Sequence, residues 1–109
     1  MFEHNKDITS LTTFGIPVKT ALFAEYSSID ELRRIFHSQE YKDNEVLHIG
    51  GGSNLLFLSD FNGLVLHSAI KGMRTYRKDD DTVFAWAGAG EKWTDFVDWC
   101  ISQGLGGLE

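Results

Sequence analysis

The chain has 109 residues, of which 42% are hydrophobic and 13% aromatic, a composition typical of one small globular domain and not of a disordered segment. Its formal net charge of −6 argues against a nucleic-acid or anionic-membrane partner, because such surfaces need clustered Lys and Arg. The single cysteine, Cys100, excludes an intrachain disulfide, and with no signal-peptide pattern and no long apolar run it favours a cytoplasmic protein.

The first half of the chain predicts a strand–helix–strand unit. Residues 20–26 form an apolar run typical of a strand, and Ser28 then opens a helix with Glu31 placed for a capping box. We expect this helix to end near residues 39–41 and to be followed by a second strand, 46–50, parallel to the first. One helix face is apolar and is expected to be buried: Ile29, Leu32, Ile35 and Phe36.

The second half predicts a third strand, a hairpin and a helix. The third strand covers residues 63–67, and residues 73–78 and 82–87 form the two arms of the hairpin. A glycine turn, Gly88-Ala89-Gly90, follows the hairpin.

A helix is expected over residues 91–103, with Gly104 as its C-terminal stop. Its apolar residues follow helical spacing and predict one buried face against the hairpin: Trp93, Phe96, Val97, Cys100 and Ile101. Trp99 falls off this face and is expected to be partly exposed. We expect an α+β fold with two units, residues 1–67 and a second, truncated unit of residues 68–109.

The strongest functional signal is the glycine-rich stretch that follows the strand at residues 46–50. Three glycines and two side-chain donors in succession can form a nest of backbone amides that binds a phosphate or diphosphate. Neither a dinucleotide fingerprint nor a P-loop fits, since Leu55 replaces the last glycine of the first motif and no Lys follows for the second. A plain turn between two strands remains the alternative reading. The candidate ligand-binding residues are Gly50, Gly51, Gly52, Ser53, Asn54 and Leu55.

Other candidate sites are weaker. Asp79, Asp80 and Asp81 are contiguous, which is typical of a solvated hairpin tip and unlike the spaced ligands of a calcium loop. The four histidines show no zinc spacing, so no metal site is predicted; His48 and His67 lie in strands, where structural roles are expected. Three tryptophans could stack on a planar cofactor, although helical spacing favours a core position for Trp93. Cys100 is expected to be a buried, inert thiol.

The order of several short motifs resembles that of a known enzyme family. The chain is similar to the N-terminal third of the UDP-N-acetylenolpyruvoylglucosamine reductase family, flavoenzymes of bacterial peptidoglycan synthesis. The motifs that carry the resemblance are Thr13-Phe14-Gly15-Ile16, Gly50-Gly51-Gly52-Ser53-Asn54-Leu55-Leu56-Phe57, Gly63-Leu64-Val65, Gly88-Ala89-Gly90-Glu91 with Trp93, and Gly104-Leu105-Gly106-Gly107-Leu108-Glu109.

The resemblance implies an FAD-binding fold of the vanillyl-alcohol-oxidase (PCMH) type, with FAD between two α+β subdomains. Residues 50–54 would cradle the FAD pyrophosphate, and the segment 88–91 would lie near the cofactor. NADPH would reduce the flavin, which would then reduce the UDP-sugar substrate.

The family's catalytic serine, arginine and glutamate and its substrate-binding domain correspond to no residue of this sequence. The chain is therefore expected to hold no catalytic residue and to be an inactive part of an enzyme. Two alternatives stay open: another oxidoreductase of the same fold, and a non-catalytic nucleotide-binding module.

Overall fold

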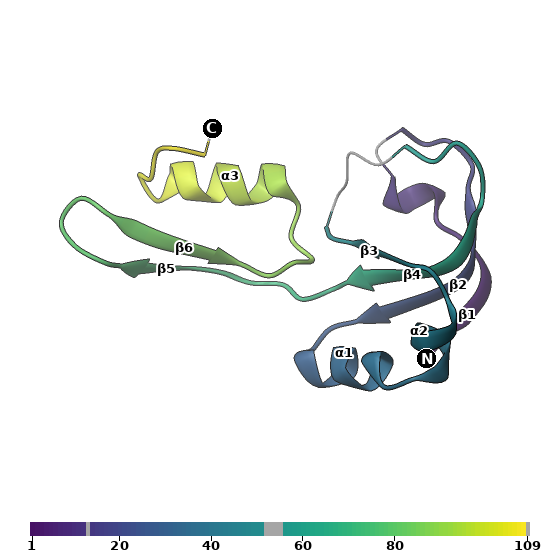
Figure 1. Ribbon diagram of the computed structural model, residues 1–109. Helices are drawn as coiled ribbons and strands as arrows, with labels where there is room; N and C mark the ends of the chain where they lie inside the picture. Colours follow the sequence, from purple (N-terminus) through teal and green to yellow (C-terminus); the bar gives the residue numbers. More distant parts are fainter. Residues whose placement is uncertain (13, 52–55, 109) are drawn as a thin grey trace.

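The computed structural model describes residues 1–12, 14–51 and 56–108, which form a larger and a smaller lobe (Figure 1). The larger lobe holds a four-stranded sheet with the strand order β1-β2-β4-β3, and the smaller lobe holds the two-stranded sheet β5–β6 beside α3. The predicted α+β class is confirmed. The strands of the larger sheet are β1 (Glu3–Asp7), β2 (Lys19–Tyr26), β4 (Phe61–Ser68) and β3 (Val46–Ile49).

Strands β2, β4 and β3 are parallel to one another, and β1 is antiparallel to β2. The first two predicted strands are thus parallel as expected, but β4 lies between them and pairs with both. Strand β1 and the short 3-10 helix η1 (Thr9–Leu11) are absent from the sequence prediction. Strand β1 is mostly exposed and largely polar, so it carries no hydrophobic alternation that would mark it as a strand.

Two helices follow β2 where the sequence predicts one. Helix α1 (Ile29–Phe36) begins as expected, because Ser28 Oγ accepts a hydrogen bond of 3.2 Å from the Glu31 amide. The Glu31 carboxylate accepts from the amide and hydroxyl of Ser27, one residue earlier than a standard capping box. The predicted end near residues 39–41 is wrong, because Ser38 caps a new helix, α2 (Gln39–Asp43), by accepting from the Tyr41 amide.

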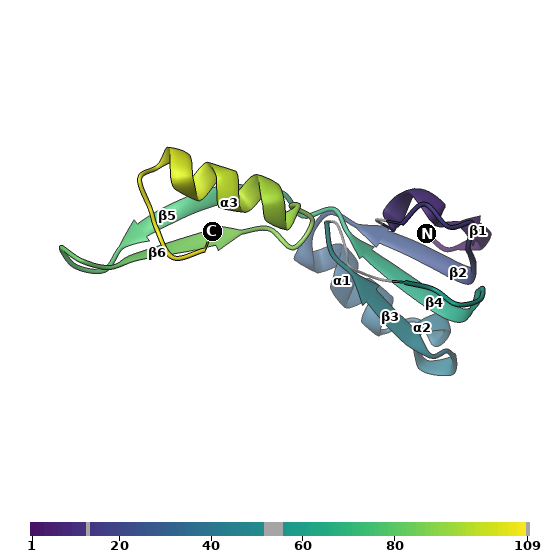
Figure 2. The same cartoon turned by 90° about the horizontal axis from the view of Figure 1, so that it is seen from above.

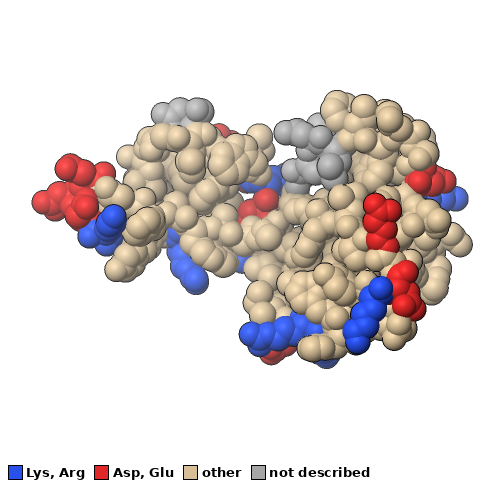
Figure 3. Space-filling model, in the orientation of Figure 1, with Lys and Arg blue, Asp and Glu red and all other residues tan. Residues whose placement is uncertain are grey.

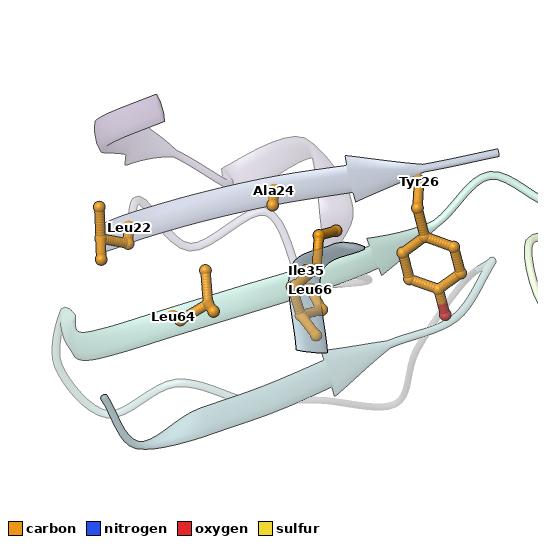
Figure 4. Packing of buried hydrophobic residues seen from close by; sticks show 6 residues of the cluster. All are labelled: Leu22, Ala24, Tyr26, Ile35, Leu64 and Leu66. Carbon is orange, nitrogen blue, oxygen red and sulfur yellow. The ribbon is translucent and has the colours of Figure 1, made fainter. Parts of the chain in front are cut away.

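The core of the larger lobe lies on both faces of its sheet. Figure 4 shows the face covered by α1, where Ile35 lies over buried residues of β2 and β4: Leu22, Ala24, Tyr26, Leu64 and Leu66. The opposite face buries a second cluster: Ile8, Val18, Phe23, Ile49 and Val65. Because β4 is buried on both faces, its central residues Leu64, Val65 and Leu66 are all apolar and do not alternate with polar ones, as expected of a central parallel strand. Of the predicted helix face, Ile35 is buried, but Ile29 and Phe36 are exposed.

The smaller lobe consists of β5 (Met73–Arg77), β6 (Val83–Ala87) and α3 (Trp93–Ser102). Figure 2 shows α3 running alongside the hairpin. Phe96 and Cys100 are buried as predicted, but the predicted core position of Trp93 is wrong, since 59% of this residue is exposed. Ile101 is also exposed. Trp93 lines an open cavity between α3 and the hairpin, together with Val83 and Phe84, so much of its surface stays exposed.

Helix α3 ends where the sequence predicts. Gly104 adopts a positive φ of 76°, and its amide donates to the Ile101 carbonyl while the Leu105 amide donates to the Cys100 carbonyl. These two bonds form a Schellman motif, which requires the left-handed conformation that glycine adopts without strain. Within the described residues, we find no helix with the length and apolarity needed to cross a membrane.

Candidate functional site

The described part of the glycine-rich stretch, Gly50 and Gly51, lies at the carboxyl edge of the larger sheet. Strands β2 and β4 end side by side at Tyr26 and Ser68, and β3 ends beside them at Ile49. Gly50 and Gly51 follow β3 directly. The other predicted binding residues, Gly52, Ser53, Asn54 and Leu55, lie outside the described residues. Ligands of open α/β sheets commonly bind beyond this edge of the strands.

Gly50 and Gly51 pack against the backbone of the second glycine turn, residues 88–91. A Cβ atom on Gly51 would lie 2.3 Å from the carbonyl oxygens of both Gly90 and Glu91, and one on Gly50 would lie 2.9 Å from the Ala89 carbonyl oxygen. Such distances exclude any side chain unless the backbone moves. Gly50 and Gly51 and the second glycine turn are far apart in the sequence but lie in direct contact.

The sequence suggested that Gly50 and Gly51 are glycines because the backbone there needs unusual conformations to bind a ligand. The structure gives a different reason. Among the described residues, the glycines with positive φ are Gly15, Gly72, Gly104 and Gly107. Gly50 and Gly51 are therefore not needed for left-handed backbone. They are needed because two main chains meet with no room for a Cβ atom between them.

The second glycine turn is fixed to the connector, residues 68–72, which leads from β4 to β5. The Gly88 amide donates to the Gly72 carbonyl at 2.9 Å, and the Gly90 amide donates to the Ile70 carbonyl at 2.8 Å. The connector is itself tied to the larger sheet, because the Ala69 amide donates to the Tyr26 carbonyl at 2.7 Å. Backbone hydrogen bonds thus link the hairpin, the connector and the end of β2.

Two charged side chains complete these links. Lys71 Nζ donates to the Gly90 carbonyl oxygen at 2.7 Å and lies 3.8 Å from Glu91 Oε1. The other carboxylate oxygen of Glu91 accepts from the Gly72 amide at 2.8 Å. Figure 3 shows basic and acidic atoms side by side at the junction of the two lobes. The sequence alone predicts no role for Lys71, and it predicts Glu91 only as part of a glycine motif and as the start of a helix.

The remaining candidates have structural surroundings. Asp79 accepts from the amides of Asp81 and Thr82, so its carboxylate stabilises the hairpin turn. Within the described part of the chain, no group of three His, Cys, Asp or Glu residues could hold a metal ion. Cys100 is 2% exposed, as expected of a core thiol.

The histidines in the strands also make local contacts. His48 Nε2 shares a hydrogen bond with the Tyr26 hydroxyl, and partial burial lowers the pKa of the His48 imidazole below its usual value of 6.5. His67 Nδ1 lies 2.8 Å from a carboxylate oxygen of Glu25 on the neighbouring strand. Each histidine therefore contacts a side chain of β2, in agreement with the structural roles predicted from their strand positions.

Comparison with known proteins adds an independent finding. A family model described as an FAD binding domain matches residues 20–108. The UDP-N-acetylenolpyruvoylglucosamine reductase of Bacteroides fragilis is 45% identical over 107 residues, which cover 98% of this chain and 32% of that protein. The reductase of the same name from Neisseria gonorrhoeae is 41% identical over 106 residues, covering 97% of this chain and 31% of that protein. The reductase of the same name from Flavobacterium johnsoniae is 39% identical over 107 residues, which cover 98% of this chain and 31% of that protein. The chain thus spans about a third of the length of these relatives.

Proposed function

The chain belongs to the FAD binding domain family, and from this membership we propose that it is the N-terminal FAD-binding part of a longer reductase. The parent enzyme would reduce UDP-N-acetylenolpyruvoylglucosamine to UDP-N-acetylmuramate for peptidoglycan synthesis in the cytoplasm. The names of relatives at 39–45% identity support this substrate. Residues 1–67 would form the first FAD-binding subdomain, and residues 68–109 the beginning of the second.

The contact between the two glycine turns is the observation that supports the cofactor site most directly. It lies at the carboxyl edge of parallel strands, where Gly50 and Gly51 follow β3. Gly52, Ser53, Asn54 and Leu55 come next in the sequence and lie outside the described residues. We assign these six residues to the FAD diphosphate, since backbone amides and small polar side chains are the groups that bind phosphate oxygens in such turns. The position of Gly50 and Gly51 beyond the carboxyl ends of parallel strands and the match to an FAD binding domain support this role.

The chain's own contribution to the reaction is binding and orientation. The chemistry that FAD would supply when bound is hydride transfer from NADPH to the enolpyruvyl group, and the proton that completes this reduction would come from outside this chain. The first glycine turn, which begins at Gly50 and Gly51, would hold the diphosphate. The second glycine turn, residues 88–91, would hold the first in place through main-chain contact. No residue of this chain is assigned a catalytic role. The UDP-sugar would bind to parts of the parent enzyme outside this chain.

The absorbance and activity of the complete protein test this proposal. The purified protein should show the visible absorbance of bound flavin, and it should oxidise NADPH only when UDP-N-acetylenolpyruvoylglucosamine is present. A yellow protein that ignores this substrate would indicate another oxidoreductase of the same fold. A protein that takes up no flavin would overturn the cofactor assignment and would favour a non-catalytic nucleotide-binding module.

A further inference from the structure

We infer that Lys71 and Glu91 are positioning residues for the FAD diphosphate site, acting through the second glycine turn. The inference rests on the proposed function, because it takes the first glycine turn as the diphosphate site. Neither residue needs to touch the cofactor. Their role follows from which backbone atoms they hold and from where those atoms lie.

The Gly90 carbonyl oxygen lies against Gly51 of the first glycine turn. It lies 2.3 Å from the place where a Cβ atom on Gly51 would be, so it directly limits where Gly51 can lie. The same oxygen accepts the hydrogen bond from Lys71 Nζ at 2.7 Å. A hydrogen bond from a charged donor is roughly twice as strong as a neutral one. Lys71 thus fixes the atom against which the first glycine turn packs.

Lys71 also has an electrostatic effect. The carbonyl oxygens of Ala89, Gly90 and Glu91 all lie against Gly50 and Gly51, and each is the negative end of a peptide dipole. A diphosphate bound at the first turn would be repelled by these oxygens. The Lys71 ammonium group on the Gly90 oxygen would offset part of that repulsion, while the Glu91 carboxylate 3.8 Å from it acts in the opposite direction.

Glu91 ties Lys71 and the second glycine turn to the connector. One oxygen of the Glu91 carboxylate accepts from the Gly72 amide at 2.8 Å, and the other lies 3.8 Å from Lys71 Nζ. The Glu91 side chain is 17% exposed, whereas that of Lys71 is 63% exposed. Glu91 therefore holds the second turn to the connector and orients Lys71. Its hydrogen bond matters more than its charge, because a negative charge near an anion site opposes binding.

The test measures the dissociation constant of FAD for the complete protein by flavin fluorescence. Lys71→Met should raise this constant about tenfold, and Lys71→Arg should stay within about twofold of the original. Lys92→Met is the matched control, because it makes the same charge change at an exposed residue next to Glu91. An equal loss of affinity in Lys92→Met and Lys71→Met would overturn the inference, since net charge alone would then explain both.

Variants of Glu91 separate positioning from charge. Glu91→Ala should weaken FAD binding about tenfold although it removes a negative charge, and Glu91→Gln, which keeps an acceptor for the Gly72 amide, should bind within about twofold of the original. Tighter binding by Glu91→Ala would overturn the inference.

Hydrogen exchange without flavin gives a readout that does not depend on the proposed cofactor. Glu91→Ala should lose protection at the amides of Gly72, Gly88 and Gly90, with the strands of the larger sheet unchanged. Unchanged exchange at these amides, or loss of protection across the whole protein, would overturn the positioning role. If the unaltered protein binds no FAD, the proposed function fails, and the exchange result still decides whether Glu91 holds the turn.

Discussion

Gly51→Ala is the substitution that tests the site most directly. The added Cβ atom would lie 2.3 Å from two carbonyl oxygens, those of Gly90 and Glu91, and 2.4 Å from the Glu91 carbonyl carbon. All three are backbone atoms, so no side-chain rotation can relieve the contact. Since Cβ contacts under 3.0 Å are essentially never seen, the two glycine turns must move apart until each distance has grown from 2.3 Å to at least 3.0 Å.

Two opposing effects determine how much Gly51→Ala changes the free energy of unfolding. Overpacking of this kind lowers the free energy of unfolding by about 1–3 kcal/mol. The φ of Gly51 is not positive, so alanine also brings the usual gain of about 0.4–1 kcal/mol from a less flexible unfolded chain. The net loss should be about 1–2 kcal/mol. Gly50→Ala, with a single contact at 2.9 Å, should lose less than Gly51→Ala.

Urea unfolding of both variants measures the cost, and flavin titration of the complete protein measures its effect on the site. If bound FAD requires the original turn geometry, the same 1–2 kcal/mol raises its dissociation constant about tenfold for Gly51→Ala. A Gly51→Ala protein as stable as the original would show that the two turns do not touch. Normal flavin affinity together with lost stability would show that their contact is purely structural.

Three further predictions concern the rest of the chain. Phe96→Ala should lower the free energy of unfolding by about 3 kcal/mol, because Phe96 is only 9% exposed. The control Trp93→Ala should lower it by less than about 1 kcal/mol, and equal losses in urea titrations would contradict the packing of α3. The 109-residue chain alone should be colourless after gel filtration and should show no substrate-dependent NADPH oxidation, and stoichiometric bound flavin or turnover would contradict this. The pKa of His48 is lowered by folding, so protonation favours the unfolded chain and stability should fall as the pH drops below 6.5. His48→Gln should lose that part of the pH dependence in unfolding curves, and an unchanged slope would contradict the assignment.

Local signals predicted most elements because each is encoded within a few residues. The cap at Ser28, the hairpin around Asp79 and the stop at Gly104 all depend on neighbours in the sequence. The failures depend on distant parts of the chain. Strand β1 exists because β2 offers it an edge, and Trp93 is exposed because the cavity between α3 and the hairpin is open.

The candidate site divides in the same way. The glycines at positions 50 and 51 could be recognised from the sequence as a place of close approach. The family resemblance placed residues 88–91 near the same cofactor, but their direct main-chain contact with Gly50 and Gly51 could not be predicted, because it depends on how the intervening hairpin folds. Lys71 and Glu91 carry no local signal, since a lone charged residue beside a turn is usually solvated. Their roles depend on hydrogen bonds that only the assembled turns provide.

The central position of β4 sets the order in which the larger lobe can form during synthesis. Strands β2 and β3 emerge from the ribosome first, yet they do not pair with each other and must wait for β4 to insert between them. Until Ser68 has left the exit tunnel, the nascent chain exposes two unpaired parallel edges and an uncovered apolar face. Unpaired edges of this kind can pair with other chains, so this lobe is expected to be prone to aggregation until β4 is in place.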